Sequence, residues 1–445
     1  MMDQKLNDWI DGQEQEIVNS LSELIAIKSV STDLPKVKEG LDWILALADR
    51  LGFQAKSVLD GQIGVVEIGD GSETLGILTH VDVVSPGEPE QWDTDPFQLK
   101  LTDGKLYGRG TLDDKGMIIA ALYAMKAAQM SGLPLRKKVQ LIIGTQEEVK
   151  WTDIYAYVKA FPLPDYGFSP DGEYPICNIE KGSATYVLSY DFSKETDPQG
   201  LCLRDVQCGY VENLVPGKAT ARLSDGRTIT AEGKAVHSCQ PERGHNALFA
   251  LYDALKPLGL AENGTYRLLR EVCEHFQDVF GKALGIYSPS EYFQGEFVHR
   301  NACSPTIFQA EDGHCTLTVN VRFAYGTDPE DLTARLSAFA EKTGGAVVRS
   351  EVLPAVFVSK DKPFLQEMAA AYEEVTGLKN EFTLAYGGSY AKAMPNIVSW
   401  GPVFPDDEDT CHEPNEYIRL DRLMSSTKIF AQTIARLAFS DKSYK

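Results

Sequence analysis

The stretch LGILTHVDVV, residues 75–84, decides the fold class of this chain. Its apolar run predicts a buried β-strand, and the run leads into His80 and Asp82. Alternate residues of a strand point to the same face, so these two polar side chains are expected side by side. Sites in open α/β sheets form beyond the carboxyl ends of the strands. The pair therefore marks a candidate site.

The surrounding segments alternate between strand and helix patterns. Apolar runs at 63–68 (IGVVEI) and 138–145 (KVQLIIGT) predict further strands, and MIIAALYAMKAAQMS (117–131) predicts a helix between them. Residues 4–27 have the periodicity of an amphipathic helix, and GLDWILALADRLGF (40–53) repeats it before a stop at Gly52. This alternation favours an α/β layer fold.

The pattern of apolar and polar residues changes after residue 182. SATYVLSYDF (183–192), TITAEGKAV (228–236) and CTLTVNVRF (315–323) are strand-like, and a helix is expected over 327–345. Helical patterns return after residue 354, and 445 residues are too many for one ordinary core. We therefore predict three segments: a first domain over 1–182, an inserted α+β domain over 183–353, and the rest of the first domain over 354–445.

The charge and the cysteines restrict the class of protein. A net charge of −21 argues against partners such as nucleic acid and anionic membranes, which attract basic proteins. The acidic N-terminus lacks a signal-peptide pattern, and no apolar run is long enough to span a bilayer. The eight cysteines are scattered without a CxxC pair, which favours reduced thiols over disulfides or a four-cysteine zinc site. A cytoplasmic enzyme is the expected class.

Four carboxylate and histidine motifs have two interpretations each. His80 with Asp82 is either a metal ligand with its orienting partner or a hydrogen-bonded pair at the core edge. The aspartates of GRGTLDDKGM (108–117) either cap the next helix or hold a cation. Glu147 and Glu148, after the strand at 138–145, form a solvated acidic turn or supply a metal ligand and a proton acceptor. Asp171 and His412 lie in segments rich in turn-forming residues, where Asp171 is either a turn residue or part of a site, and His412 either a solvent-exposed histidine or part of a site.

Taken together, these motifs resemble one family. The set HVDVV, GRGTLDDKG, EE, SPDGEYP, EKG, AVHSCQPERGHNA, AYGGSYA and CHEPNEY is similar to that of the M20 metallopeptidases, most of all their bacterial dipeptidase (PepV-like) branch. The resemblance runs over nearly the whole chain. It implies a catalytic domain with a mixed sheet covered by helices, and an inserted α+β lid domain.

The resemblance also implies two divalent cations, Zn²⁺ or Mn²⁺, which accept mixed carboxylate and imidazole ligands. Residues matching the family's metal ligands are His80 and Asp171 for the first ion, Glu148 and His412 for the second, and Asp113 as the bridge. Asp114 would help to position that bridge. Glu147 matches the general base and Asp82 the partner that orients His80. No GxSxG motif supports a serine nucleophile.

Substrate contacts are implied in the same way. His237 matches a histidine that stabilises the oxyanion, and Arg322 an arginine that binds the substrate carboxylate. Asn213 would bind the same region, and the glycine-rich loop Gly387, Gly388 and Ser389 would contact substrate through its backbone. The sequence departs from the branch at Gln146, where Asp is common, and in GGSYA, where GGTYA is common. Neither departure removes a ligand.

The predicted function is hydrolysis of small peptide substrates, the unblocked dipeptides, by a water activated at the metal site. Another M20 chemistry stays open, either deacylation of N-acyl amino acids or carboxypeptidase action. So do a catalytically silent homologue, either metal-stabilised or partner-binding, and an unrelated α/β protein with acidic surface turns. The large insertion favours a monomer, with a homodimer left open.

Overall fold

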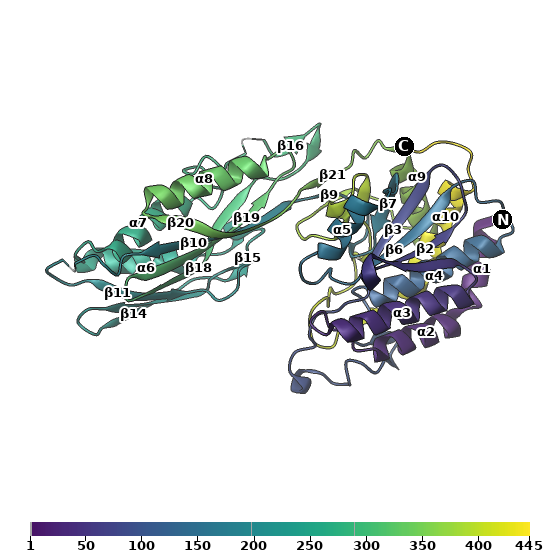
Figure 1. The fold of residues 1–445 in the computed structure, drawn as a ribbon, viewed down its shortest axis with the longest axis horizontal. Helices are drawn as coiled ribbons and strands as arrows, with labels where there is room; N and C mark the ends of the chain where they lie inside the picture. Colours follow the sequence, from purple (N-terminus) through teal and green to yellow (C-terminus); the bar gives the residue numbers. More distant parts are fainter. Residues whose placement is uncertain (1, 197, 289) are drawn as a thin grey trace. The chain divides into compact units, whose positions relative to one another are not determined.

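A computed structural model describes residues 2–196, 198–288 and 290–445. Two compact units divide the chain: the first runs up to Ile179 and resumes from Phe357 to Lys445, and the second is Glu180–Val356 (Figure 1). The predicted fold class is confirmed, because a mixed sheet with helices forms the first unit and an α+β arrangement the second. The roles of catalytic domain and lid stay predictions, since compactness assigns no role.

The first unit contains a nine-stranded sheet. Its order is β1 (Gln54–Val58), β2 (Ile63–Ile68), β6 (Lys138–Gly144), β3 (Thr74–His80), β7 (Tyr166–Ser169), β23 (Ile397–Ser399), β9 (Cys177–Glu180) and β21 (Val356–Phe357), with β22 (Thr383–Ala385) paired to β9. The central strand β3 runs parallel to β6 and β7, and β2 runs antiparallel to β6. The parallel strands bring their carboxyl ends to one edge, where the candidate site lies.

Helices pack around this sheet. They are α1 (Met2–Asp11), α2 (Glu14–Ala26), α3 (Leu34–Arg50), α4 (Lys115–Met130), α5 (Thr152–Ala160), α9 (Pro363–Thr376) and α10 (Leu420–Ala438). Helices α4 and α10 contact each other and both β3 and β6. Helix α4 is buried on nearly all sides, because apolar residues occupy every face of it and not a single stripe. Its first turn is thereby fixed beside the end of β3.

Two local predictions for the first unit were wrong. The helix expected over 4–27 is broken at Gly12 and Gln13, although the predicted apolar face is kept: Leu6, Ile10, Ile17, Leu21 and Leu24 are all buried. The strand expected over 75–84 ends at His80. Beyond it the chain leaves the sheet, and Val83 exchanges backbone hydrogen bonds with Ser29 and Ser31.

The second unit is a seven-stranded sheet with helices on one face (Figure 1). The strand order is β14 (Thr228–Glu232), β13 (Lys218–Leu223), β11 (Leu203–Cys208), β18 (Ala302–Glu311), β19 (His314–Phe323), β10 (Gly182–Asp191) and β20 (Gly345–Leu353). The helices are α6 (Ala247–Leu255), α7 (Gly264–Phe276) and α8 (Pro329–Lys342). Alternation along β19 sends Leu317, Val319 and Val321 into the core under these helices, as the sequence predicted.

Short strands complete the two units. They are β4 (Lys100–Thr102), β5 (Lys105–Tyr107), β8 (Gly172–Glu173), β12 (Leu214–Val215), β15 (Val236–His237), β16 (Tyr292–Phe293), β17 (Glu296–Phe297), β24 (Pro402–Val403) and β25 (Tyr417–Arg419). The segment 228–236, expected as one strand, is divided between β14 and β15. Pairing of β25 with β5 holds the segment after His412 beside the chain that leads to Asp113.

Candidate metal centre

The site is built where β3 and β6 end side by side. Parallel pairing sets His80 opposite Gly144, so the residues after both strands emerge together. The backbone N–H groups of Glu147 and Glu148 donate to the two carboxylate oxygens of Asp82, at 3.1 and 3.2 Å. The interpretation of Glu147–Glu148 as a solvated acidic turn is wrong, since the turn is clamped from inside and the Glu148 side chain is only 6% exposed.

His80 is fully enclosed and held in one orientation. Its Nδ1 lies 2.9 Å from the backbone carbonyl oxygen of Asp82 and 3.5 Å from the Asp82 carboxylate. A carbonyl can only accept, so in the neutral ring Nδ1 carries the proton and the Nε2 lone pair is left for a ligand. Asp82 thus orients His80 mainly through its backbone, while its carboxylate positions the two glutamates.

Asp113 lies between two histidines. Its Oδ1 is 2.9 Å from Nε2 of His80, and its Oδ2 is 3.0 Å from Nε2 of His412. The Glu148 carboxylate is 3.1 Å from the same His412 atom, and Asp171 Oδ2 is 3.8 Å from His80 Nε2. One oxygen of the Asp113 carboxylate therefore faces His80, which Asp171 also approaches, and the other faces His412, which Glu148 also approaches.

Asp114 occupies the position before α4, but its side chain does not cap the helix. Its Oδ2 accepts the backbone N–H of His80 at 3.1 Å, and the residue is fully buried. The capping interpretation of the two aspartates is therefore wrong for the side chains. One of them faces the histidines, and the other holds the end of β3 against the first turn of α4.

Buried carboxyls accumulate at this site without enough positive charge. Burial and the neighbouring Asp113 raise the pKa of Glu148 to about 7 and that of Asp171 to about 8. Burial and the charge of Asp171 raise the pKa of Glu147 well above its usual range. Asp113 differs: despite burial, contacts with His412 and His80 hold its pKa well below the usual value. A cluster of this composition fits divalent cations, which supply the missing charge.

Glu416, which sequence reasoning missed, fastens the segment containing His412. Its carboxylate accepts from the Arg109 guanidinium at 2.6 Å and from the backbone N–H groups of Gly110, Leu112 and Asp113. Both Arg109 and Glu416 are buried. They occur in the GRG and CHEPNEY motifs, but nothing in a single sequence pairs residues so far apart.

A second buried carboxylate clamps the backbone directly after β6. Asp153, buried in α5, accepts the backbone N–H groups of Thr145 and Gln146 and the hydroxyl of Tyr390. Tyr390 follows the glycine-rich loop, in which Gly387 and Gly388 are exposed and Ser389 is buried. The Ser389 hydroxyl accepts from Ala391 N–H as η5 (Tyr390–Ala393) begins. The exposed loop is thereby connected to the backbone that carries Glu147.

In the second unit, the predicted substrate residues form a group of their own. Strand β12 pairs with β15 with Leu214 opposite His237, and the carbonyl of Asn213, one residue earlier, accepts the N–H of Ser238. Ser238 donates to Asn320, which in turn accepts from Arg322 Nε at 3.2 Å. Nδ1 of His237 accepts the N–H of Cys239, so the neutral ring carries its proton on Nε2. Burial and the charge of Arg322 lower the pKa of His237.

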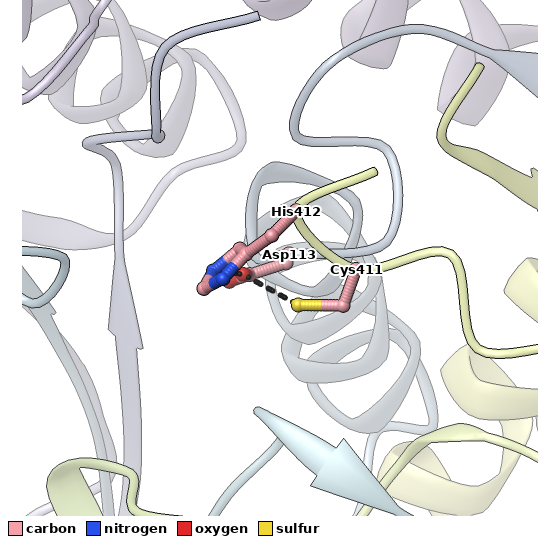
Figure 2. A group of neighbouring side chains, drawn as sticks. All are labelled: Asp113, Cys411 and His412. Carbon is pink, nitrogen blue, oxygen red and sulfur yellow. Dashed lines mark hydrogen bonds and ion pairs between the residues drawn. The ribbon is translucent and has the colours of Figure 1, made fainter. Parts of the chain in front are cut away.

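Among the residues that the structure describes, the side chains that could hold a metal fall into two groups of three. One is His80, Glu147 and Asp171, and the other is Asp113, Cys411 and His412, with the ligand atoms of each group within 4.8 Å of one another (Figure 2). These groups contain five of the carboxylates and histidines predicted from the sequence, and Glu148 joins through His412. Cys411 was not predicted. The only signal for it was its place next to His412.

One family model matches the chain, over residues 76–436, and its description is peptidase family M20/M25/M40. Among curated proteins, a "Putative dipeptidase" of Staphylococcus saprophyticus is 30% identical over 473 residues, covering 98% of this chain and 99% of the relative. A "Putative dipeptidase" of Staphylococcus aureus (strain MW2) is 31% identical, covering 96% of this chain and 98% of the relative.

Solved structures share the fold. Human carnosine dipeptidase 1 aligns with a TM-score of 0.63 at 18% identity, over 98% of this chain and 99% of that one. The di-peptidase Dug1p from Saccharomyces cerevisiae aligns with a TM-score of 0.64 at 14% identity, over 99% of both chains. Within the described residues, no helix is long and apolar enough to cross a membrane.

Proposed function

The chain belongs to the peptidase family M20/M25/M40, as its motifs predicted, and from this premise we propose that it is a dipeptidase working with two divalent cations. The observation that carries the proposal is the Asp113 carboxylate, whose two oxygens face His80 and His412 at 2.9 and 3.0 Å. A carboxylate shared in this way suits a bridge between two ions. The dipeptide preference is supported by the two staphylococcal relatives, each named a putative dipeptidase.

His80 and Asp171 would hold one ion, Glu148 and His412 the other, and Asp113 both. When bound, the cation pair would polarise the scissile carbonyl and make a water molecule more acidic. Zn²⁺ and Mn²⁺ both accept this mixture of ligands. The ions would also return the raised pKa values of the carboxyls towards their ordinary range, since each carboxylate would gain a positive neighbour.

Glu147 would act as the general base. Its carboxylate is grouped with His80 and Asp171, and its backbone is fixed by Asp82. It would take a proton from the attacking water and pass it to the leaving amine. No residue of the chain needs to become covalently attached to substrate.

The second unit would act as a lid that completes the substrate site. The Nε2–H of His237 is suited to stabilise the oxyanion, because hydrogen bonding at Nδ1 fixes the proton on the other nitrogen. The Arg322 guanidinium would bind the terminal carboxylate of the substrate. Asn213 and the backbone of Gly387, Gly388 and Ser389 would make further contacts. An arginine for one terminus favours substrates with a free carboxylate.

A cytoplasmic location is part of the proposal. It is supported by the cysteines, all eight of which are free thiols, as expected in a reducing compartment.

The proposal is tested on a substrate panel. Protein stripped by a chelator and refilled with Zn²⁺ or Mn²⁺ is given free dipeptides, a tripeptide and an N-acetylated amino acid. Metal-dependent cleavage of the dipeptides alone is the expected result. Cleavage of the acetylated compound would instead indicate a deacylase, and shortening of the tripeptide from its C-terminus a carboxypeptidase. Inactivity with every metal would overturn the proposal in favour of a silent homologue.

A further inference from the structure

A sulfur atom and an imidazole nitrogen approach the same carboxylate oxygen. Sγ of Cys411 and Nε2 of His412 each lie 3.0 Å from Oδ2 of Asp113. Figure 2 shows both side chains converging on Asp113 from adjacent positions in one segment. The thiol donates a hydrogen bond to the carboxylate. Cys411 thus supplies a donor atom of a third chemical type at this position.

The other side of the same carboxylate also indicates a cation. Asp113 Oδ1 and His80 Nε2 lie 2.9 Å apart as an ion pair, but their geometry is not that of a hydrogen bond, and within the described part of the chain neither atom has another hydrogen-bond partner. Asp113 is 7% exposed and His80 is 1% exposed, so water does not readily satisfy them. Buried polar atoms without partners are rare and call for an explanation. Two such atoms 2.9 Å apart have the spacing of two ligands of one ion.

We propose that Cys411 is a ligand, through Sγ, of the cation held by Asp113 and His412. This inference rests on the proposed two-cation site and adds a sulfur donor to its carboxylate and imidazole ligands. Binding replaces the S–H bond by a sulfur–metal bond, and the proton goes to solvent. The metal keeps its oxidation state, so the step needs no oxidant or reductant.

The spacing of the donor atoms is compatible with this role. Zinc bonds of about 2.3 Å to sulfur and 2.0 Å to nitrogen or oxygen, at angles near the tetrahedral value, put ligand atoms roughly 3.3–3.5 Å apart. A five-coordinate ion would take Cys411 beside Asp113, Glu148 and His412 and still keep a position for water. The contacts of 3.0 Å from Oδ2 to Sγ and to Nε2 are slightly shorter, and a small outward movement of the side chains would admit the ion. Thiolate sulfur favours Zn²⁺ over Mn²⁺. Cys411 would therefore bias this half of the centre towards zinc.

Cobalt substitution gives a readout that is independent of activity. The metal-free full chain is titrated with Co²⁺ and its absorption spectrum recorded. Bands in the visible report bound cobalt whatever its ligands, whereas a sulfur-to-cobalt charge-transfer band in the near ultraviolet requires a bound thiolate. The same titration is run on Cys411→Ser and on Cys177→Ser. Cys177 is the control, since it is the other cysteine of the first unit; it is buried, whereas Cys411 is partly exposed.

The expected result is both kinds of band in the native protein and in Cys177→Ser, with loss of the charge-transfer band alone in Cys411→Ser. The visible bands of Cys411→Ser also show that this variant still folds and binds cobalt. Competition between Zn²⁺ and Mn²⁺ should reveal a reduced zinc preference in the same variant. Visible bands without a charge-transfer band in the native protein would overturn the role of Cys411 and leave the metal site standing. Absence of all bands would overturn the proposed metal-dependent function itself.

Discussion

The two segments that meet at the candidate metal centre are held in different ways. The turn after β6, which carries Glu147 and Glu148, is clamped through its backbone by the buried carboxylates of Asp82 and Asp153. The segment with Cys411 and His412 belongs to no helix or strand, and the His412 side chain is 53% exposed. Its main anchor is Glu416, four residues beyond His412.

This difference separates two parts of the site. Groups that must keep a fixed direction, such as a general base, are best placed on a rigid strand end. A ligand at the solvent edge can adjust when an ion enters. The comparison therefore predicts that loss of the base in the β6 turn will affect turnover, that loss of the clamps of this turn will affect metal affinity and stability, and that loss of the main anchor at Glu416 will cost the most stability.

Replacing the proposed base should have the largest effect. Glu147→Gln is expected to lower kcat by about 10²–10⁴-fold, the usual contribution of a positioned general base. Metal content should stay unchanged, because the amide keeps the shape of the side chain. The measurement is steady-state hydrolysis of a dipeptide with the metal content of each sample determined. Turnover near that of the native protein, with metals bound, would show that the base is another group.

Removing the Glu416 anchor of the segment that contains His412 should lower folding stability. Glu416→Gln leaves the buried Arg109 guanidinium without its counter-charge, and removal of one partner of a buried pair costs about 3–5 kcal/mol. The free energy of unfolding, determined with urea, measures this loss. Glu413→Gln, in the exposed part of the same segment, is the control and should change stability by less than about 0.5 kcal/mol. Equal effects from the two variants would contradict the anchoring role.

Asp82→Asn tests the backbone clamp of the β6 turn. The amide can accept from one of the two N–H groups of Glu147 and Glu148 but presents its own NH₂ to the other. Metal affinity should fall by about 10–100-fold, as it does when groups that orient ligands are removed. Titration of the metal-free protein by calorimetry gives the value. The exposed Asp70→Asn should bind metal as the native protein does.

A smaller effect is expected at the second clamp. Tyr390→Phe removes the hydroxyl that donates to Asp153 at 2.8 Å and should lower the free energy of unfolding by about 1–2 kcal/mol. Tyr155→Phe, on the same helix as Asp153, removes a hydroxyl for which the described part of the chain shows no hydrogen bond, and serves as the control. If both variants melt alike, the clamp contributes nothing to stability.

The folding stability of the metal-free protein should decrease gradually as the pH rises. The pKa of Glu148 is raised to about 7 and that of Asp171 to about 8, mainly by burial, so the folded state binds protons that the unfolded state has released. Stability is therefore greatest below about pH 4 to 4.5 for these two groups and is lost as pH rises towards 8. Thermal unfolding from pH 5 to 8 measures this trend, which added Zn²⁺ or Mn²⁺ should abolish.

Local periodicity predicted much of the fold. The strand at 63–68, the helix after the two aspartates and the alternation along β19 all follow from spacing that short windows contain. The break at Gly12 was missed, because the apolar spacing continues on both sides of it. The early end of β3 was missed because Val83 pairs with the segment around Ser29, which no pattern within 75–84 records.

The residues of the candidate site were also predicted only in part. The resemblance identified the carboxylates and histidines that the structure groups together around Asp113. It did not identify Glu416, Arg109 or Asp153, which act on backbone groups or on partners up to 307 positions away. Such pairings depend on the completed tertiary fold. Cys411 was missed for another reason, since a cysteine next to a histidine carries no signal until its sulfur is seen beside Asp113.

The place of β23 in the sheet constrains the order in which the molecule can be assembled. Residues 397–399 lie between β7 and β9, although more than 200 residues separate them from either strand in the sequence. A ribosome delivers the chain from its N-terminus, and domains generally fold as units. The seven-stranded sheet of the second unit can thus form while the first sheet still lacks an inner strand. His412 emerges later still, so a nascent chain cannot complete the candidate metal centre until the segment after β23 has left the ribosome.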